Sequence, residues 1–255
     1  MKMVKNNIKN RKLKNRKIIN YHNLKEPDTL LPLSKKEIVN DFCSFIGQES
    51  YPCIGAQTAL NSNMISVGFF GCMNHENTSE QICEGLYRYI DAMKDRPSSF
   101  LTYIAIFENE CISNEEHYEN ELWDLLFSMH SYDNQKYSWN NEVSNHTLNK
   151  NFSYSIGGEA FFLVGMHPQS SRRARRFKYP AIAFNLHSQF ELLRENNRFQ
   201  RIKNVIRDRE MDFQGSINPM LSDYGHGLEA PQYSGRKVSK NWQCPYSFRK
   251  ENEME

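Results

Sequence analysis

Apolar residues recur at two different spacings along this chain, and the spacing predicts where helices and strands lie. Several segments repeat their apolar positions every three or four residues, which is typical of helices that pack one face on a core. We expect the first of them to begin after Ser34 as N-cap, with Ile38, Phe42 and Ile46 facing inward. The predicted helices cover residues 34–47, 77–97, 113–133, 170–177, 188–196 and 198–213.

Short runs of β-branched and aromatic residues lie between these helices. Such runs predict buried strands, and they cover residues 65–70, 100–108, 160–166 and 181–185. The segment 133–153 is polar and rich in Asn, and Gly, Pro, Ser and Tyr dominate from residue 215 onward, so we expect an exposed loop and an irregular C-terminal segment. Because helices and strands alternate without a repeat, the pattern predicts an α/β (or α+β) domain with a central sheet flanked by helices.

The first residues differ from the rest in charge. The net charge of the 255 residues is +2, but residues 1–18 hold eight Lys or Arg and no acid. We expect residues 1–33 to be a disordered basic tail and residues 34–255 to form a single domain. The remaining chain is acidic on balance, so no nucleic-acid partner is expected.

Other features of the composition indicate in which cellular compartment the protein is found. No apolar run reaches the roughly 20 residues that span a bilayer, and the N-terminal segment lacks the apolar stretch of a secretory signal. The six cysteines lie scattered, without a pair at zinc-binding spacing. We therefore expect a cytoplasmic protein without a membrane partner, with mostly reduced cysteines.

Two histidines stand at the ends of predicted strands. His167 follows the strand 160–166, and His187 follows the strand 181–185. If these strands are neighbours, both imidazoles would open onto one edge of a pocket, although a single histidine in such a place is usually structural. A dinucleotide-binding, phosphate-loop, serine-hydrolase or zinc-protease motif is absent from the sequence.

A run of arginines follows His167 directly. Arg172 and either Arg175 or Arg176 would share one face of the predicted helix 170–177. Guanidinium groups bind carboxylates and phosphates through two parallel hydrogen bonds, and the N-terminus of the helix would add backbone donors. The run thus predicts an anion site. The alternative is that these arginines only form the solvent-exposed face of a helix.

Four long stretches of this sequence are similar to the YqcI/YcgG family. They are GGEAFFLVGMHPQSSRRARRF, AFNLHSQFELLR, IRDREMDFQGSINPMLSDYG and EAPQYSGRKVSKNWQCPY, and the earlier YPCIGAQTA also fits. The resemblance covers residues 40–248. Members of this family with an assigned role are haem-dependent N-hydroxylases of guanidino compounds, so the resemblance implies a haem b cofactor, a mixed catalytic domain and a small guanidino substrate.

The haem that the resemblance implies would need an axial ligand and partners for its propionates. We expect His187 as the proximal ligand and His167 across the pocket or behind it, although the reverse order is open. Cys244, which precedes Pro245, is a weaker alternative as a thiolate ligand. Arg172, Arg175, Arg176 and Arg236 are the residues expected at the propionates.

A guanidino substrate would need a carboxylate. Asp223 and Glu229 come first because the irregular C-terminal segment can fold over a pocket, and Glu159 and Glu191 are further candidates. Asn218 is expected to hydrogen-bond bound oxygen or substrate. The reaction would use O2 or peroxide and an external electron donor, since the sequence holds no reductase module. A homodimer would not be surprising.

Three other functions are compatible with the same residues. A haem-binding sensor or carrier would use the same histidines without turnover. A non-haem anion-binding protein would use the arginines alone. A mononuclear iron site would need a carboxylate beside His167 and His187, and it would leave the arginines unexplained.

Overall fold

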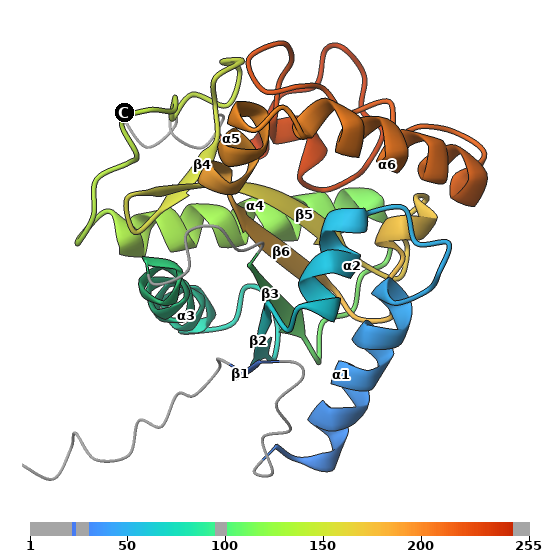
Figure 1. Cartoon of the computed structure of the whole chain (residues 1–255). Helices are drawn as coiled ribbons and strands as arrows, with labels where there is room; N and C mark the ends of the chain where they lie inside the picture. The colour runs from blue at the N-terminus through green and yellow to red at the C-terminus, as the bar shows by residue number, and fades with distance from the viewer. Residues whose placement is uncertain (1–21, 24–30, 95–100, 247–255) are drawn as a thin grey trace, which may run out of the picture.

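The sheet at the centre of the molecule carries helices on both faces (Figure 1). In this computed structural model, residues 22–23, 31–94 and 101–246 are described. Their strand order is β1-β2-β3-β6-β5-β4. β2 and β3 run parallel, and the other neighbouring pairs are antiparallel. The strands are β1 (His22–Asn23), β2 (Ile65–Phe70), β3 (Thr102–Phe107), β4 (Tyr154–Ile156), β5 (Glu159–Met166) and β6 (Ala181–Leu186).

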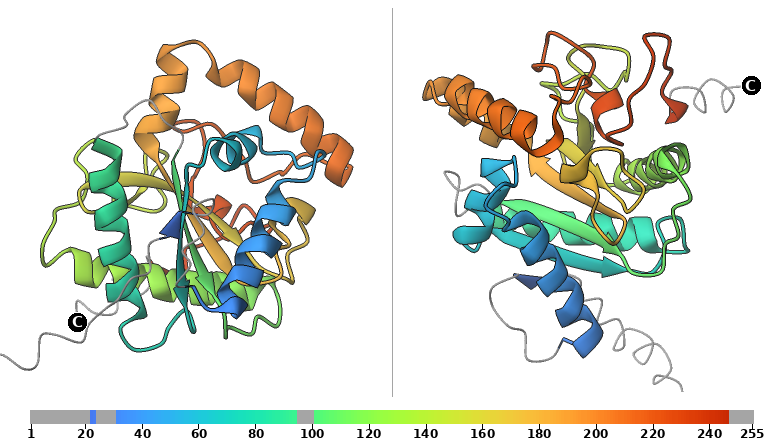
Figure 2. Two further views of the ribbon diagram at one scale, coloured as in Figure 1. Left: turned by 60° about the horizontal axis from the view of Figure 1, so that its bottom comes forward. Right: turned by 90° about the vertical axis from the view of Figure 1, so that its right-hand side faces the viewer.

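Helices cover the two sheet faces in pairs. α3 and α4 pack over one face and α1 and α2 over the other, while α5 and α6 follow β6 at one end of the sheet (Figures 1 and 2). The described α-helices are α1 (Leu33–Ile46), α2 (Ile54–Asn61), α3 (Thr78–Lys94), α4 (Glu115–Asp133), α5 (His187–Glu195) and α6 (Phe199–Gln214). The structure thus confirms the predicted mixed α/β class. No helix in the described part of the chain is long and apolar enough to cross a membrane.

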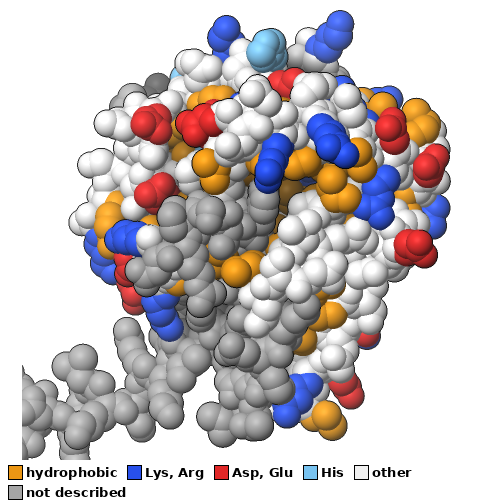
Figure 3. Space-filling model, in the orientation of Figure 1, with side chains coloured by type: hydrophobic (Ala, Val, Ile, Leu, Met, Phe, Trp, Pro, Cys, Tyr) orange, Lys and Arg blue, Asp and Glu red, His pale blue; other side chains and the backbone are white. Residues whose placement is uncertain are grey.

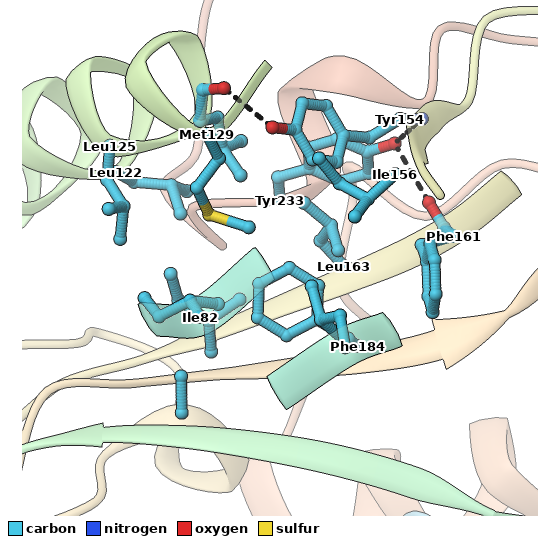
Figure 4. Packing of buried hydrophobic residues seen from close by; sticks show 14 of the residues in the cluster. Ile82, Leu122, Leu125, Met129, Tyr154, Ile156, Phe161, Leu163, Phe184 and Tyr233 are labelled. Carbon is cyan, nitrogen blue, oxygen red and sulfur yellow. Dashed lines mark hydrogen bonds between the residues drawn. The ribbon is translucent and has the colours of Figure 1, made fainter. Parts of the chain in front are cut away.

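The core on the α3–α4 side is built largely from aromatic residues. Leu122, Leu125 and Met129 of α4 face Phe184 of β6, and Tyr233 reaches into the same cluster from the C-terminal segment (Figure 4). The Tyr233 hydroxyl accepts a hydrogen bond from the Tyr154 backbone N–H at 3.0 Å. This aromatic anchor fixes the irregular segment that follows α6, although that segment has little regular structure of its own.

Most predicted elements lie where their spacing placed them, but several differ, and the short strands β1 and β4 were not predicted. α1 begins after Pro32 rather than after Ser34. The helix expected over residues 170–177 is wrong, because only the 3-10 turn η1 (Arg173–Arg175) forms there. The backbone N–H of Ser171 donates to Glu115 and that of Arg173 to Gln214, so these donors are not engaged in a helical ladder. α2 was not predicted, because Pro52 and Gly55 read as a turn.

The basic tail expected over residues 1–33 lies mostly outside the described residues. Within it, His22 and Asn23 form β1 and pair with Val67 and Ser66 of β2.

Candidate functional site

A pocket of about 400 Å³ lies on the sheet face that carries α1 and α2. Its walls come from α2, α5, α6 and the segment after α6. Figure 3 shows apolar surface in a hollow below α6, with Lys and Arg side chains along its upper rim. The floor is formed by strand residues, among them Ile65, Ile104, Phe162, Val164, Met166, Ala183 and Asn185. Pockets of this size and apolar character usually hold a small organic molecule or a cofactor.

The pocket brings together six of the residues that the sequence analysis selected. They are Arg172, Arg175, His187, Asn218, Asp223 and Glu229. The other selected residues are not among its lining residues: His167, Arg176, Arg236, Cys244, Glu159 and Glu191.

His187 is the first residue of α5 and stands at one end of the pocket. It is 9% exposed, and its ring lies 4.3 Å from the ring of Tyr224. Its Nε2 lies 3.9 Å from Glu229 Oε2 and its Nδ1 lies 3.8 Å from Glu191 Oε1, both too long for a hydrogen bond. Burial lowers the pKa of His187 to about 4, with a further contribution from Arg194. The imidazole is therefore neutral at pH 7 and keeps a lone pair for a ligand.

Glu229 is the buried carboxylate of the site, with an exposed fraction of 4%. Its Oε1 accepts hydrogen bonds from the Ser153 hydroxyl at 2.9 Å and from the Tyr233 hydroxyl at 2.5 Å. Burial raises its pKa to about 7, although both hydrogen bonds oppose that shift. Because two hydroxyls anchor one oxygen, Oε2 is the atom left beside His187.

The prediction that His167 and His187 share a pocket edge is wrong. β5 and β6 are neighbours, but they are antiparallel and pair Met166 with Ala181 and Phe161 with Leu186. The strand ends that carry the two histidines are thus about 17 Å apart along the sheet. His167 is fully buried and stacks on Tyr118 at 4.3 Å. A mononuclear iron site that uses both histidines is excluded by the same separation.

Two arginines of the predicted anion site do line the pocket. Arg172 binds the carboxylate of Glu210 at 2.6 Å, with both side chains 9% exposed. Arg175 contacts no carboxylate among the described residues. Its Nη1 donates instead to the carbonyl oxygens of Gln232 and Tyr233. Burial lowers the pKa of Arg175. A buried guanidinium without a carboxylate favours an anionic group on whatever occupies the pocket.

The other two arginines expected at the propionates serve the fold. Arg176 is exposed and donates from Nε to the Ser170 carbonyl at 2.7 Å. Arg236 binds Glu119 of α4. Cys244, the alternative thiolate ligand, is buried in the core on the α3–α4 side, away from the pocket.

Asp223 and Asn218 line the pocket but already have partners. Asp223 accepts a hydrogen bond from Lys203 Nζ at 2.6 Å, which lowers its pKa. The Asn218 Oδ1 accepts from the Met220 backbone N–H at 3.0 Å and so shapes the turn after α6. Of the three proposed catalytic residues, Glu229 is the buried carboxylate, and its Oε2 faces His187.

A second, polar pocket lies on the other side of His187. It contains Glu142, Glu159 and Glu191, and it shares Arg194 and Tyr224 with the first pocket. Glu191 is paired with Arg194. Glu159 and Glu191, the further candidates for substrate binding, thus line the polar pocket and not the apolar one.

Two contributors to the pocket were missed by sequence reasoning. One is α6, whose residues Ile202, Lys203, Ile206 and Arg207 face the pocket at helical spacing; this spacing was the available signal. The other is Cys53, which lines the pocket from the N-terminus of α2. Among the described residues, no group of three or more His, Cys, Asp and Glu side chains is arranged to hold a metal ion.

Comparisons with known proteins agree on one family. The model of the YqcI/YcgG family matches residues 42–247. The uncharacterized protein YqcI of Bacillus subtilis (strain 168) is 28% identical over 208 residues, which cover 78% of this chain and 81% of the relative. No solved structure matches the chain.

Proposed function

The chain belongs to the YqcI/YcgG family, and from that premise we propose that it is a haem-dependent monooxygenase that N-hydroxylates a small guanidino compound. The observation that carries the proposal is the apolar pocket with one buried carboxylate, Glu229, beside a neutral imidazole, His187. The resemblance to haem-dependent N-hydroxylases supplies the reaction class. Haem, when bound, supplies the activation of O2 or peroxide with electrons from outside the chain.

The residues of the pocket fit a haem in three respects. The strand floor and the apolar face of α6 offer surfaces for a flat apolar ring. Cys53 and His187 both line the pocket and both belong to the residue types that bind haem iron. Arg175 and Arg207 have no carboxylate in contact within the described part of the chain, so they suit propionate groups. This set replaces the four arginines expected from the sequence, of which Arg175 alone keeps that role.

Glu229 suits the cationic end of the substrate. A guanidinium donates parallel hydrogen bonds to a carboxylate, and Oε2 of Glu229 lies free of hydrogen-bond partners among the described residues while Ser153 and Tyr233 hold Oε1. Burial excludes water that would compete for this oxygen. His187 Nε2 lies 3.9 Å from the same oxygen, so its neutral ring can accept a hydrogen bond from a guanidinium N–H.

The experiment that tests the proposal supplies hemin-loaded protein with O2, a chemical reductant and arginine, and detects an oxygenated product by mass spectrometry. We expect a product one oxygen heavier than arginine, and much less of it from Glu229→Gln at the same low arginine concentration. Haem that is retained without product or guanidine binding across a series of guanidines would instead indicate a sensor or carrier. Tight binding of polyanions without haem would indicate the anion-binding alternative.

A further inference from the structure

Cys53 occupies a distinctive position in the pocket wall. It is the N-cap of α2, and its Sγ accepts a hydrogen bond from the Ala56 backbone N–H at 3.4 Å. The backbone N–H of Gly55 also points to the sulfur. Burial raises the pKa of the Cys53 thiol, while these backbone donors and the positive charges of Arg209 and Arg175 oppose the rise; backbone donors and the positive end of a helix favour the thiolate form. The structure thus places a sulfur that accepts from backbone N–H groups in the wall of an apolar pocket.

His187, the other side chain in the pocket wall of a type that binds haem iron, stands at the opposite end. Tyr51, two residues before Cys53, donates from its hydroxyl to the Ala174 carbonyl at 2.9 Å, which ties this segment to the turn that follows Met166. His187 lies where β6 ends, opposite Phe161. The sulfur and the imidazole therefore approach the pocket from the two ends of the β5–β6 pair.

His187 shares its end of the pocket with Glu229. The 3.9 Å between His187 Nε2 and Glu229 Oε2 leaves no room for a metal ligand and a substrate clamp to act on opposite faces of one planar group. His187 is also about nine-tenths buried and has no hydrogen-bond partner among the described residues, so a ligand is expected at this end too. The short distance to Glu229 assigns His187 to the substrate side, and the lack of a partner leaves its ring available to a ligand there.

We propose, on the basis of the function proposed above, that Cys53 is the axial ligand of the haem iron and that His187 and Glu229 together face the substrate. To bind the iron, the Cys53 thiol would lose its proton to water and the sulfur would donate a lone pair to ferric iron, so no electron would be transferred. Thiolate is a soft ligand that iron accepts readily. The N–H groups of Gly55 and Ala56 then tune the iron through the sulfur.

The test is the absorption spectrum of the ferrous–CO form of the hemin-loaded protein, compared among four proteins: wild type, Cys53→Ser, Cys43→Ser and His187→Ala. Serine keeps an N-cap acceptor for α2, so Cys53→Ser should fold with a melting temperature close to that of wild type. Cys43 is the matched control, since it packs on the same side of the sheet but does not line the pocket. The spectrum reports the ligand without any turnover.

We expect a Soret band far to the red in wild type, Cys43→Ser and His187→Ala, and its loss in Cys53→Ser. A wild-type band without the red shift, or a band that changes in His187→Ala and not in Cys53→Ser, would overturn the assignment while the proposed function stands. Wild-type protein that retains no hemin would overturn the proposed function itself, and the assignment with it.

Discussion

Glu229→Gln should weaken the binding of a guanidine to the hemin-loaded protein by about 10- to 100-fold, since a hydrogen bond to a charged group contributes about 1.5–3 kcal/mol. Glutamine keeps the shape of the side chain and an oxygen for Ser153 and Tyr233, but removes the charge that faces the pocket. The loss should therefore appear in ligand affinity and not in the melting temperature. The measurement is a titration with arginine followed by the change in the haem spectrum.

The matched control is Glu191→Gln. Glu191 also lies within 4 Å of His187, but it is paired with Arg194 and lines the polar pocket. Its change should leave the affinity unaltered. Because the pKa of Glu229 is raised to about 7, wild-type affinity should also rise between pH 6 and pH 8 as the carboxylate ionises, and Glu229→Gln should lose this rise. Equal affinity in wild type and Glu229→Gln would exclude the proposed role.

Arg172→Met should lower the free energy of unfolding by about 3–5 kcal/mol, because it leaves a buried carboxylate without its cation. Glu210 is 7% exposed, and its other oxygen accepts from the Asn218 backbone N–H at 3.1 Å. The pair joins η1 to α6 and thereby holds a wall of the pocket. Urea denaturation monitored by circular dichroism gives the free energy.

The double variant Arg172→Met/Glu210→Leu should recover most of that loss, since an apolar pair of similar volume replaces both charges. Lys94→Met is the control, because the Lys94–Asp91 pair is 70% exposed on both sides and such pairs stabilise little. If Arg172→Met unfolds at the same urea concentration as Lys94→Met, the buried pair does not hold the wall.

Much of the fold follows from local sequence. The six-residue strands β2 and β3 are buried along their whole length, and their unbroken apolar runs made them predictable. α3, α4 and α6 carry periodic apolar faces over four or more turns. By contrast, the arginines at residues 172–176 have high helix propensity, yet acceptors on Glu115, Gln214 and Phe213 hold the segment in a turn. These contacts cross more than 35 residues, so local spacing gives no signal of them.

The candidate site was predictable in part. The sequence indicated His187 and Glu229 separately, but their proximity depends on the hydrogen bond between Ser153 and Glu229 across 76 residues. The antiparallel direction of β5 and β6 decided against His167, and the connecting segment alone did not reveal that direction. Cys53 belongs to the stretch YPCIGAQTA, which the resemblance includes, whereas its place in the pocket depends on how α2 packs against the sheet.

The most direct test of a haem site in this pocket is the absorption spectrum of hemin-loaded protein after gel filtration, for wild type and for Ala183→Trp. Ala183 lies on the pocket floor and is 8% exposed, so an indole there fills the space for the ring. Val205→Trp, on the exposed face of α6, is the control for the added side chain. We expect one retained haem per chain in wild type and Val205→Trp and none in folded Ala183→Trp. A wild-type protein without a Soret band, or equal retention in all three, would contradict this expectation.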